Sequence, residues 1–278
     1  MATPIGNLAD ISLRALHVLQ LADAVACEDT RHTQALLRAY GIDKAASQLL
    51  AVHQHNETEA AQGVIERLRQ GQRVAYASDA GTPAVSDPGT RLVAAVREAG
   101  VRCVPLPGAS SVTALLSVAG AIGDDAAFVF AGFLPAKAGE RDAAVARLAQ
   151  DTRAAVLLEA PHRIEALARS LASLRARPVT VGRELTKQFE EVATLPCAAL
   201  PAWLAADPQR TRGEFALVLH TAPDAPQRDE GERVLVLLLA ELPVKTAVRL
   251  AAEITGSPRN GLYDMALRLK RSGGKDPA

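Results

Sequence analysis

Short apolar runs alternate with segments of helical periodicity along the first 120 residues. Four runs have the length of a β-strand and are rich in Val, Ala and Leu, namely residues 23–28, 48–53, 73–78 and 101–106. Three segments between or beside them have the apolar spacing of an amphipathic helix and end on a glycine, namely 33–41, 57–71 and 90–100. Repeated strand–helix units predict a parallel sheet with helices on both faces.

The pattern changes after residue 120. Five further runs predict strands at residues 128–133, 154–160, 178–184, 190–195 and 214–220. Amphipathic helices at 141–150 and 162–174 separate the earlier runs, whereas the last strands follow one another closely. A mixed α+β sheet is therefore expected for residues 121–220.

The last part of the chain is helical. A polar, proline-containing stretch at 221–232 is typical of a linker, and three short helical patterns follow at 233–242, 245–254 and 259–270. The last two flank the sequence "TGSP" and resemble a helix-turn-helix. We thus predict an α/β domain at 1–120, a second α/β domain at 121–220, a linker at 221–230 and a helix-turn-helix-like segment at 231–278.

Composition excludes several classes of protein. The 31 basic and 31 acidic residues cancel, so no overall field attracts the chain to nucleic acid or to an anionic membrane. The three cysteines are far apart in sequence and suggest neither a disulfide framework nor a metal motif, which fits a reducing cytoplasm. The most apolar run, at 234–242, is too short to span a bilayer. We expect a soluble cytoplasmic protein with no membrane partner.

One loop is longer than its position requires. Residues 77–89, "ASDAGTPAVSDPG", follow the strand at 73–78, and in parallel sheets ligands bind beyond the carboxyl ends of strands. Glycine and proline let a backbone approach a ligand, and Ser78, Asp79, Thr82 and Asp87 add polar side chains. The alternative is a long turn in which Asp87 or Thr90 caps the next helix.

Two more loops are expected at the same edge. "TPIGN" begins at Thr3, and "PLPGASS" follows the run at 101–106. Neither contains a dinucleotide or P-loop fingerprint, so a ligand without phosphates is favoured.

Seven motifs occur in a characteristic order: "TPIGNLADISLRAL", "CEDTRHTQALL", "SDAGTPAVSDPG", "PLPGASS", "GFLPAK", "RELTK" and "RGE". Together they resemble the ribosomal RNA small subunit methyltransferase I family, within the tetrapyrrole methylase superfamily. The resemblance covers nearly the whole chain, from Thr3 through the terminal helices.

The resemblance implies a fold and an activity. The fold would be the two-domain α/β tetrapyrrole-methylase fold, followed by a small helical segment. The activity would be methyl transfer from S-adenosylmethionine to the ribose 2′-hydroxyl of a cytidine in the decoding region of 16S rRNA, leaving S-adenosylhomocysteine. A homodimer acting on RNA within the 30S subunit is implied. The matching cofactor positions are Pro4, Ser78, Asp79, Ala80, Gly81, Thr82, Ser110, Ser111, Phe133 and Gly213.

Such a reaction depends mainly on positioning, with help from a general base or a stabilising charge because a ribose hydroxyl is a poor nucleophile. "CEDTRH" offers Glu28, Asp29 and Arg31, and "RELTK" offers Lys187. These four residues are the catalytic candidates. The alternative for the first motif is a capped helix start, with Asp29 or Thr30 as N-cap.

Other polar residues suggest RNA contact rather than a metal. "HQHNE" at 53–57 lacks the further ligands that a metal site needs, so we expect no metal and a polar lip of the cleft. His162 and Arg163 are expected to begin a helix, with RNA contact as the alternative. The basic candidates for RNA contact are Arg31, Arg163, Arg183, Lys245, Arg249 and Arg259. We expect the terminal segment to help dock RNA and to be dispensable for cofactor binding.

Two other functions remain open on the sequence. A related tetrapyrrole (precorrin-type) methylase would transfer the same methyl group to a ring carbon. A DNA-binding regulator would use the terminal helices, although more than two hundred residues of enzyme-like α/β pattern disfavour this class.

The amino terminus departs from the family pattern, in which a short apolar strand precedes "TPIGN". Here only Met1 and Ala2 precede Thr3. If that strand were missing, its neighbours in the sheet would have unpaired backbone N–H and C=O groups. Each such buried group would lower the stability by roughly 1 to 3 kcal/mol. We therefore expect that Met1 is not the natural start and that about five more apolar residues complete the sheet.

Overall fold

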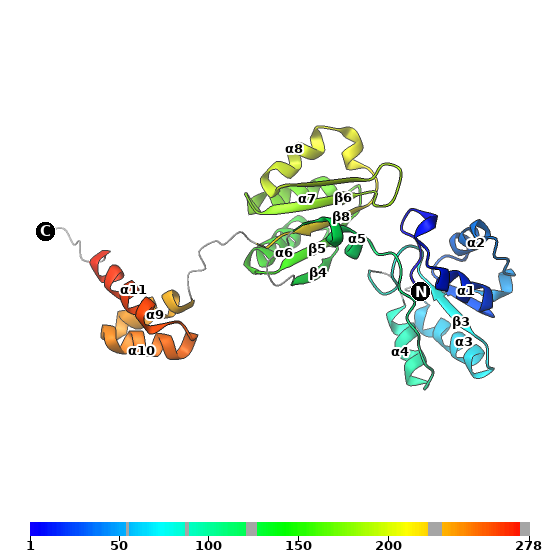
Figure 1. Cartoon of the computed structure of the whole chain (residues 1–278), viewed down its shortest axis with the longest axis horizontal. Coiled ribbons are helices and arrows are strands. Elements are labelled where there is room, and N and C mark those ends of the chain that lie inside the picture. The colour runs from blue at the N-terminus through cyan, green and yellow to red at the C-terminus, as the bar shows by residue number, and fades with distance from the viewer. Residues whose placement is uncertain (54–55, 87–88, 121–126, 222–229, 273–278) are drawn as a thin grey trace. The chain divides into compact units, whose positions relative to one another are not determined.

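The computed structural model describes residues 1–53, 56–86, 89–120, 127–221 and 230–272. The chain divides into two compact units, Met1–Ala222 and Pro223–Ala278 (Figure 1). The first unit begins with a parallel sheet in the order β2-β1-β3. Its strands are β1 (Ala24–Cys27), β2 (Leu49–Ala51) and β3 (Val74–Ala77).

Helices cover both faces of this sheet, as the alternating pattern predicts. Leu19 and Leu37 pack on one face, and Ile65 and Leu92 pack on the other. The helices that carry these side chains are α1 (Leu13–Leu21), α2 (Thr30–Ala39), α3 (Glu57–Arg69) and α4 (Thr90–Glu98). The glycines predicted to end three of these segments, Gly41, Gly71 and Gly100, have positive φ angles.

The strand predicted at residues 101–106 is wrong, because this segment has no regular secondary structure. The amide of Ala2 donates to the carbonyl of Leu106 at 3.2 Å, and Thr3 forms an isolated bridge with Gly81. The short segment before Pro4 thus lies beside the loops but does not provide a ladder of hydrogen bonds. An apolar run becomes a strand only when a neighbouring strand satisfies its backbone.

A mixed sheet follows, as predicted, in the order β4-β5-β8-β6-β7. The β4–β5 pair is parallel, and the other pairs are antiparallel. The strands are β4 (Phe128–Gly132), β5 (Ala154–Glu159), β6 (Pro178–Arg183), β7 (Glu191–Pro196) and β8 (Phe215–Leu219).

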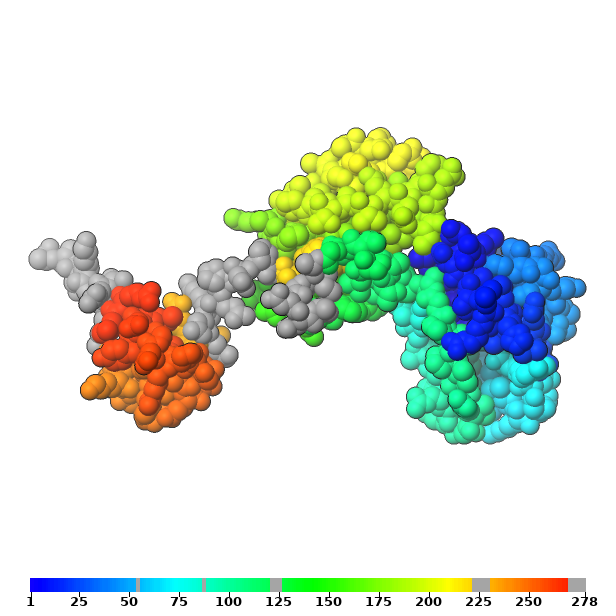
Figure 2. Space-filling model, viewed as in Figure 1, coloured from blue at the N-terminus to red at the C-terminus, as the bar shows by residue number. Residues whose placement is uncertain are grey.

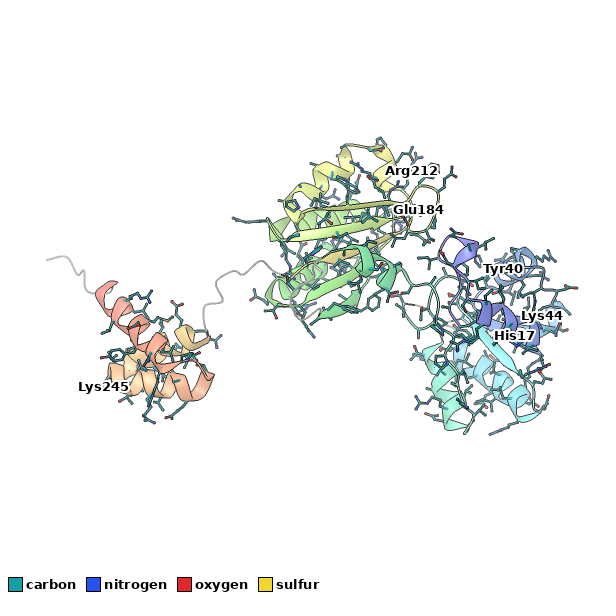
Figure 3. The ribbon with its side chains drawn as sticks, viewed as in Figure 1. His17, Tyr40, Lys44, Glu184, Arg212 and Lys245 are labelled. Atoms are coloured by element: carbon teal, nitrogen blue, oxygen red, sulfur yellow. The ribbon has the colours of Figure 1, made fainter. Side chains whose placement is uncertain are left out.

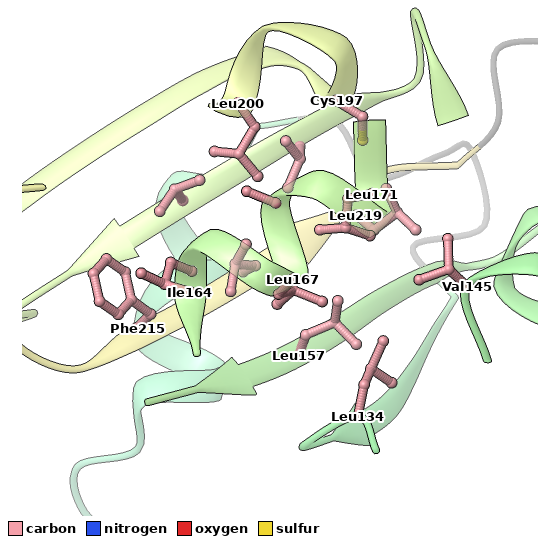
Figure 4. Close-up of a cluster of buried hydrophobic side chains, with 14 of the residues drawn as sticks. Leu134, Val145, Leu157, Ile164, Leu167, Leu171, Cys197, Leu200, Phe215 and Leu219 are labelled. Carbon is pink, nitrogen blue, oxygen red and sulfur yellow. The ribbon is translucent and has the colours of Figure 1, made fainter. Parts of the chain in front are cut away.

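The main hydrophobic core lies on one face of the mixed sheet, where Leu157 and Leu219 meet Leu167, Leu171 and Leu200 (Figure 4). The helices of this face are α6 (Ala138–Gln150), α7 (Ile164–Leu171) and α8 (Leu200–Ala205). Short 3₁₀ turns complete the unit at Leu8–Asp10, Ala46–Gln48, Ala172–Leu174, Cys197–Ala199 and Pro208–Thr211.

The opposite face of the mixed sheet is covered by α5 (Ser111–Val118), which the sequence analysis did not predict. Val112 and Leu115 of this helix pack against Val156, Ala216 and Val218. A helix that precedes residue 120 therefore belongs, by its packing, to the second sheet. The domain boundary at residue 120 stays a prediction.

The second unit, orange to red in Figure 2, contains the three predicted terminal helices. They are α9 (Glu230–Glu241), α10 (Val244–Thr255) and α11 (Arg259–Ser272). Leu235, Ala247, Ala251, Leu262 and Ala266 form their core. The predicted linker lies mostly outside the described residues, and its last residue, Glu230, begins α9. Among the described helices, none is long and apolar enough to cross a membrane.

Candidate active site

Hydrogen bonds join the three loops that the sequence places at the carboxyl edge of the first sheet. Thr3 and Gly81 exchange backbone hydrogen bonds of 2.9 and 3.0 Å, and the Thr3 hydroxyl donates to the Ser78 carbonyl at 3.0 Å. The Thr82 hydroxyl donates to the carbonyl of Ala109 at 3.1 Å. "TPIGN", "SDAGTP" and "PLPGASS" therefore form one connected surface.

Three carboxylates gather beside these loops. Glu28 and Asp29 directly follow β1, Asp79 follows β3, and Asp79 Oδ1 accepts a hydrogen bond of 3.2 Å from the Asp29 amide. Burial raises the pKa of Glu28 above its ordinary 4.5, and the charges of Asp79 and Asp29 raise it further, against an opposing effect of His53. The cluster is thus a site of negative potential that favours a bound cation.

Asp29 and Arg31 hold the start of α2. Asp29 Oδ1 accepts from the Arg31 amide at 2.8 Å, and the Arg31 guanidinium reaches Asp29 Oδ2 at 3.0 Å. The side-chain hydrogen bond from Arg31 lowers the pKa of Asp29 to about 2, which makes Asp29 a weak base. The N-cap alternative is confirmed for Asp29. Among the four catalytic candidates, Glu28 is the carboxylate best suited to accept a proton.

Lys187 lies between two carboxylates at the end of the mixed sheet. Its Nζ is 2.9 Å from Glu184 Oε1 and 2.9 Å from Glu214 Oε2. Burial opposes its charge, but the hydrogen bonds to these two residues outweigh burial and hold the pKa of Lys187 above 10.5. Lys187 is therefore a cation at neutral pH and can stabilise negative charge but not abstract a proton.

The N-terminal loop meets this cluster. A Cβ on Gly6 would overlap the Lys187 side chain, and a Cβ on Gly213 would overlap Glu184. Gly213 also has a φ of +86°, which favours glycine. Both glycines thus allow the close packing of "TPIGN", "RELTK" and "RGE".

Replacing Lys187 by methionine is expected to lower the free energy of unfolding by roughly 1 to 2 kcal/mol near neutral pH. The pKa of Glu184 is lowered in the folded protein. The ionised Glu184 side chain therefore contributes to the free energy of unfolding above pH 4.5, and this contribution is lost in more acidic solution. The pKa of Lys187 is raised in the folded protein. The charged Lys187 side chain therefore contributes to the free energy of unfolding below pH 10.5, and this contribution is lost in more alkaline solution. Urea unfolding of both proteins across this range should show the difference disappear at both ends. A difference independent of pH would contradict the ion cluster.

A pocket of about 360 Å³ opens beside Glu184, the partner of Lys187. Figure 3 shows Glu184 and Arg212 at this end of the mixed sheet. The lining residues are Arg183, Glu184, Phe189, Gln209, Arg212 and Gly213. The Arg183 side chain is 9% exposed, lies 3.6 Å from Glu191 and donates to the Phe189 carbonyl. This buried role removes Arg183 from the candidates for RNA contact.

The remaining predicted cofactor residues have different surroundings. Pro4 is buried, Ala80 is exposed, and Ser110 precedes α5 without capping it through its side chain. Ser111 begins that helix, and Phe133 follows β4 with 51% of its surface exposed. A Cβ on the neighbouring Gly132 would lie 3.7 Å from the Ser86 hydroxyl, which places the end of β4 beside the long loop.

Glu57 has a role that the sequence analysis missed. It is buried in the first turn of α3, and its Oε1 accepts from the amides of Gly89, Arg91 and Leu92 at 2.9, 2.8 and 3.0 Å. The start of α4 is therefore capped by a different helix. The predicted cap by Thr90 is wrong, because Gly89 precedes the helix and Glu57 satisfies its amides. Asp87, the other predicted cap, lies outside the described residues.

Arg163 is also held inside the fold. Its Nε is 3.1 Å from the buried Glu159, and its Nη2 donates to the Leu134 carbonyl. It precedes α7, as expected, and its guanidinium is engaged within the fold, so RNA contact stays the alternative for this residue. In the described part of the chain, no group of His, Cys, Asp and Glu side chains could hold a metal ion. His55 of "HQHNE" lies outside that part.

Comparison with known proteins agrees with this architecture. Residues 2–201 match the family model Tetrapyrrole (Corrin/Porphyrin) Methylases, and residues 225–270 match the RsmI C-terminal HTH domain. The chain is 47% identical over 276 residues to Ribosomal RNA small subunit methyltransferase I of Neisseria meningitidis serogroup A, covering 97% of this chain and 92% of the relative. The chain belongs to the ribosomal RNA small subunit methyltransferase I family.

Other members are similar over the same length. The proteins of the same name from Pseudomonas aeruginosa and Vibrio cholerae are 46% and 44% identical, covering 96% and 95% of this chain and 95% and 92% of the relatives. Solved structures of cobalt precorrin-4 methyltransferase and diphthine synthase share the fold, with TM-scores of 0.57 and 0.59 at 19% and 16% identity. The two matches cover 78% and 79% of this chain, and 92% and 88% of the respective solved chains. The predicted fold, with its C-terminal helical segment, is confirmed.

Proposed function

We propose that this protein transfers a methyl group from S-adenosylmethionine to the ribose 2′-hydroxyl of a cytidine in the decoding region of 16S rRNA. The substrate would be RNA assembled in the 30S subunit, and the enzyme would act as a homodimer in the cytoplasm. The observation that carries the proposal is the near full-length identity to proteins named Ribosomal RNA small subunit methyltransferase I.

The residues present fit S-adenosylmethionine. This molecule carries a positive sulfonium and an ammonium group, which suit the negative potential around Glu28, Asp29 and Asp79. Asp79 uses Oδ1 for the Asp29 amide, and no described residue donates to its Oδ2. Gly81, with a φ of +80°, lets the loop turn and pair with Thr3, which holds Asp79 in place beside the other two loops. The pocket beside Gly213 and the exposed Phe133 provide further contact surface.

The chain's own residues supply the remaining chemistry. Bound S-adenosylmethionine provides an activated methyl group, so the protein needs to position the acceptor hydroxyl in line with it. We assign Glu28 as the general base that takes the hydroxyl proton, since its pKa is raised toward the working pH. Asp29 and Arg31 fix the backbone that carries Glu28, and Lys187 supplies positive charge at the end of the mixed sheet.

Replacing Asp79 by alanine is expected to weaken S-adenosylmethionine binding by about 10- to 100-fold, because a charged hydrogen-bond acceptor is lost. Isothermal titration calorimetry measures this change, and Asp43→Ala, an exposed aspartate elsewhere on the chain, is the control. Binding should be unaffected by a chelator. If Asp79→Ala lowers only the melting temperature, Asp79 shapes the turn and does not bind the cofactor.

The function is tested with 30S subunits from a strain lacking the gene. Incubation with the purified protein and labelled S-adenosylmethionine should label 16S rRNA, and primer extension should map one ribose methyl group in the decoding region. Naked 16S rRNA should be a poorer substrate, because RNA recognition reads shape. Methylation of a base, or of a tetrapyrrole carbon instead of RNA, would disprove the proposal.

A further inference from the structure

Charge is unevenly distributed among the helices of the C-terminal unit. Helix α9 carries three glutamates and one arginine. Helices α10 and α11 together carry six basic residues and two acidic ones. These two helices therefore carry an excess of basic residues, although the whole chain has no net charge.

A pocket of about 450 Å³ lies between α10 and α11. It is lined by Lys245, Thr246, Val248, Arg249, Arg259, Asn260 and Tyr263. Lys245 lies at the start of α10 (Figure 3), and Arg259 lies at the start of α11. The lining thus contains three cations, three polar side chains and no carboxylate.

Two of these cations have no ion-pair partner among the described residues. Lys245 and Arg259 are both exposed, and neither forms a salt bridge in the part of the chain that the structure describes. Arg249 pairs with Glu253 at 3.2 Å, but both side chains are about half exposed, so the pair contributes little stability and can exchange for another anion. All three cations are available to a ligand.

The pocket is not needed to hold the helices together. The core of the unit is formed by buried apolar side chains such as Leu235, Ala251 and Leu262. Tyr263 is 40% exposed, and its ring provides a flat surface beside the cations. Cations, hydrogen-bond donors and an aromatic ring on one surface match the phosphates and bases of a nucleic acid.

We propose that the face of α10 and α11 formed by Lys245, Arg249 and Arg259 binds the phosphate backbone of RNA. This inference rests on the proposed function, which makes RNA rather than DNA the polymer that the protein meets. In helix-turn-helix modules, the start of the second helix contacts the nucleic acid while the first helix crosses its backbone. Arg259, Asn260 and Lys245 occupy the corresponding positions.

The test measures binding of the full-length protein to a fluorescein-labelled RNA hairpin by fluorescence anisotropy at several salt concentrations. Lys245→Ala and Arg259→Ala should each weaken binding by about 5- to 10-fold near 0.1 M salt and reduce the salt slope by about one. Arg233→Ala is the matched control, because Arg233 is exposed on α9 and does not line the pocket. It should bind RNA like the wild type.

Lys245→Arg should retain binding, and melting curves should show that all variants are folded, since the changed side chains are exposed. The proposal is overturned if Lys245→Ala and Arg259→Ala bind like the wild type, or if Arg233→Ala loses as much affinity as they do. Tighter binding of a DNA hairpin of the same sequence assigns the face to DNA and also overturns it. If the hairpin results are as expected but 30S subunits are not methylated, the proposed function fails and the phosphate-binding face stands.

Discussion

Glu28→Gln is expected to slow methyl transfer to 30S subunits by about 10²- to 10⁴-fold, the usual contribution of a general base. Glutamine has the same shape but cannot take up the hydroxyl proton. Because Glu28 must be deprotonated to act, the wild-type rate should rise with pH through the pKa of Glu28, which burial places above 4.5. This dependence should be absent in the variant. Single-turnover rates at saturating S-adenosylmethionine measure both effects, and calorimetry separately measures the weaker cofactor binding expected when the acidic cluster loses one charge.

Asp29→Asn is the control for this experiment. Asparagine caps a helix about as well as aspartate, so α2 should be retained and the rate should change only a few-fold. Equal losses in the two variants would mean that the acidic cluster acts through its total charge. A normal rate in Glu28→Gln would exclude Glu28 as the base.

Glu57→Ala should lower the free energy of unfolding by about 3 kcal/mol, because three amides at the start of α4 lose a charged acceptor. For a unit of this size, that corresponds to a fall in melting temperature of about 6 to 12 °C. Differential scanning calorimetry provides the measurement. Glu59→Ala, in the same helical turn, is the control, since Glu59 is exposed and should change stability by less than about 0.5 kcal/mol. Equal effects of the two changes would show that the cap is unimportant.

The three central strands of the mixed sheet could be predicted closely because their apolar runs are buried on both faces, whereas the edge strands β4 and β7 follow an alternating pattern of exposure. β5 and β8 illustrate this, since nearly every residue of each is buried. The run at 101–106 has a similar composition but is not a strand, because strand formation also depends on a partner that the local sequence does not encode. Helix α5 was missed because its sequence, SVTALLSV, contains no charged residue to mark a polar face, whereas α7 has the same length and a clear amphipathic period.

The candidate site could be predicted in part because its residues directly follow strands. The sequence could not show which of Glu28 and Asp29 is the better candidate for the general base. Only the structure shows that the Arg31 guanidinium donates to the Asp29 carboxylate. The sequence also could not reveal that Glu57 caps α4, because the amides that donate to Glu57 are 32 to 35 positions away along the chain. The links from Lys187 to Glu214 and Gly6 are likewise long-range contacts.

Helix α5 has a consequence for how sequences of this family can diverge. Its first residues join the loops of the first sheet, while Leu115 packs on the mixed sheet against Gly182. A Cβ at position 182 would lie 2.7 Å from Leu115 Cδ1 and 3.0 Å from Leu185 Cδ2. A larger side chain at position 182 therefore requires a smaller one at position 115. Across relatives, these two positions should covary, even though 67 residues separate them in the chain.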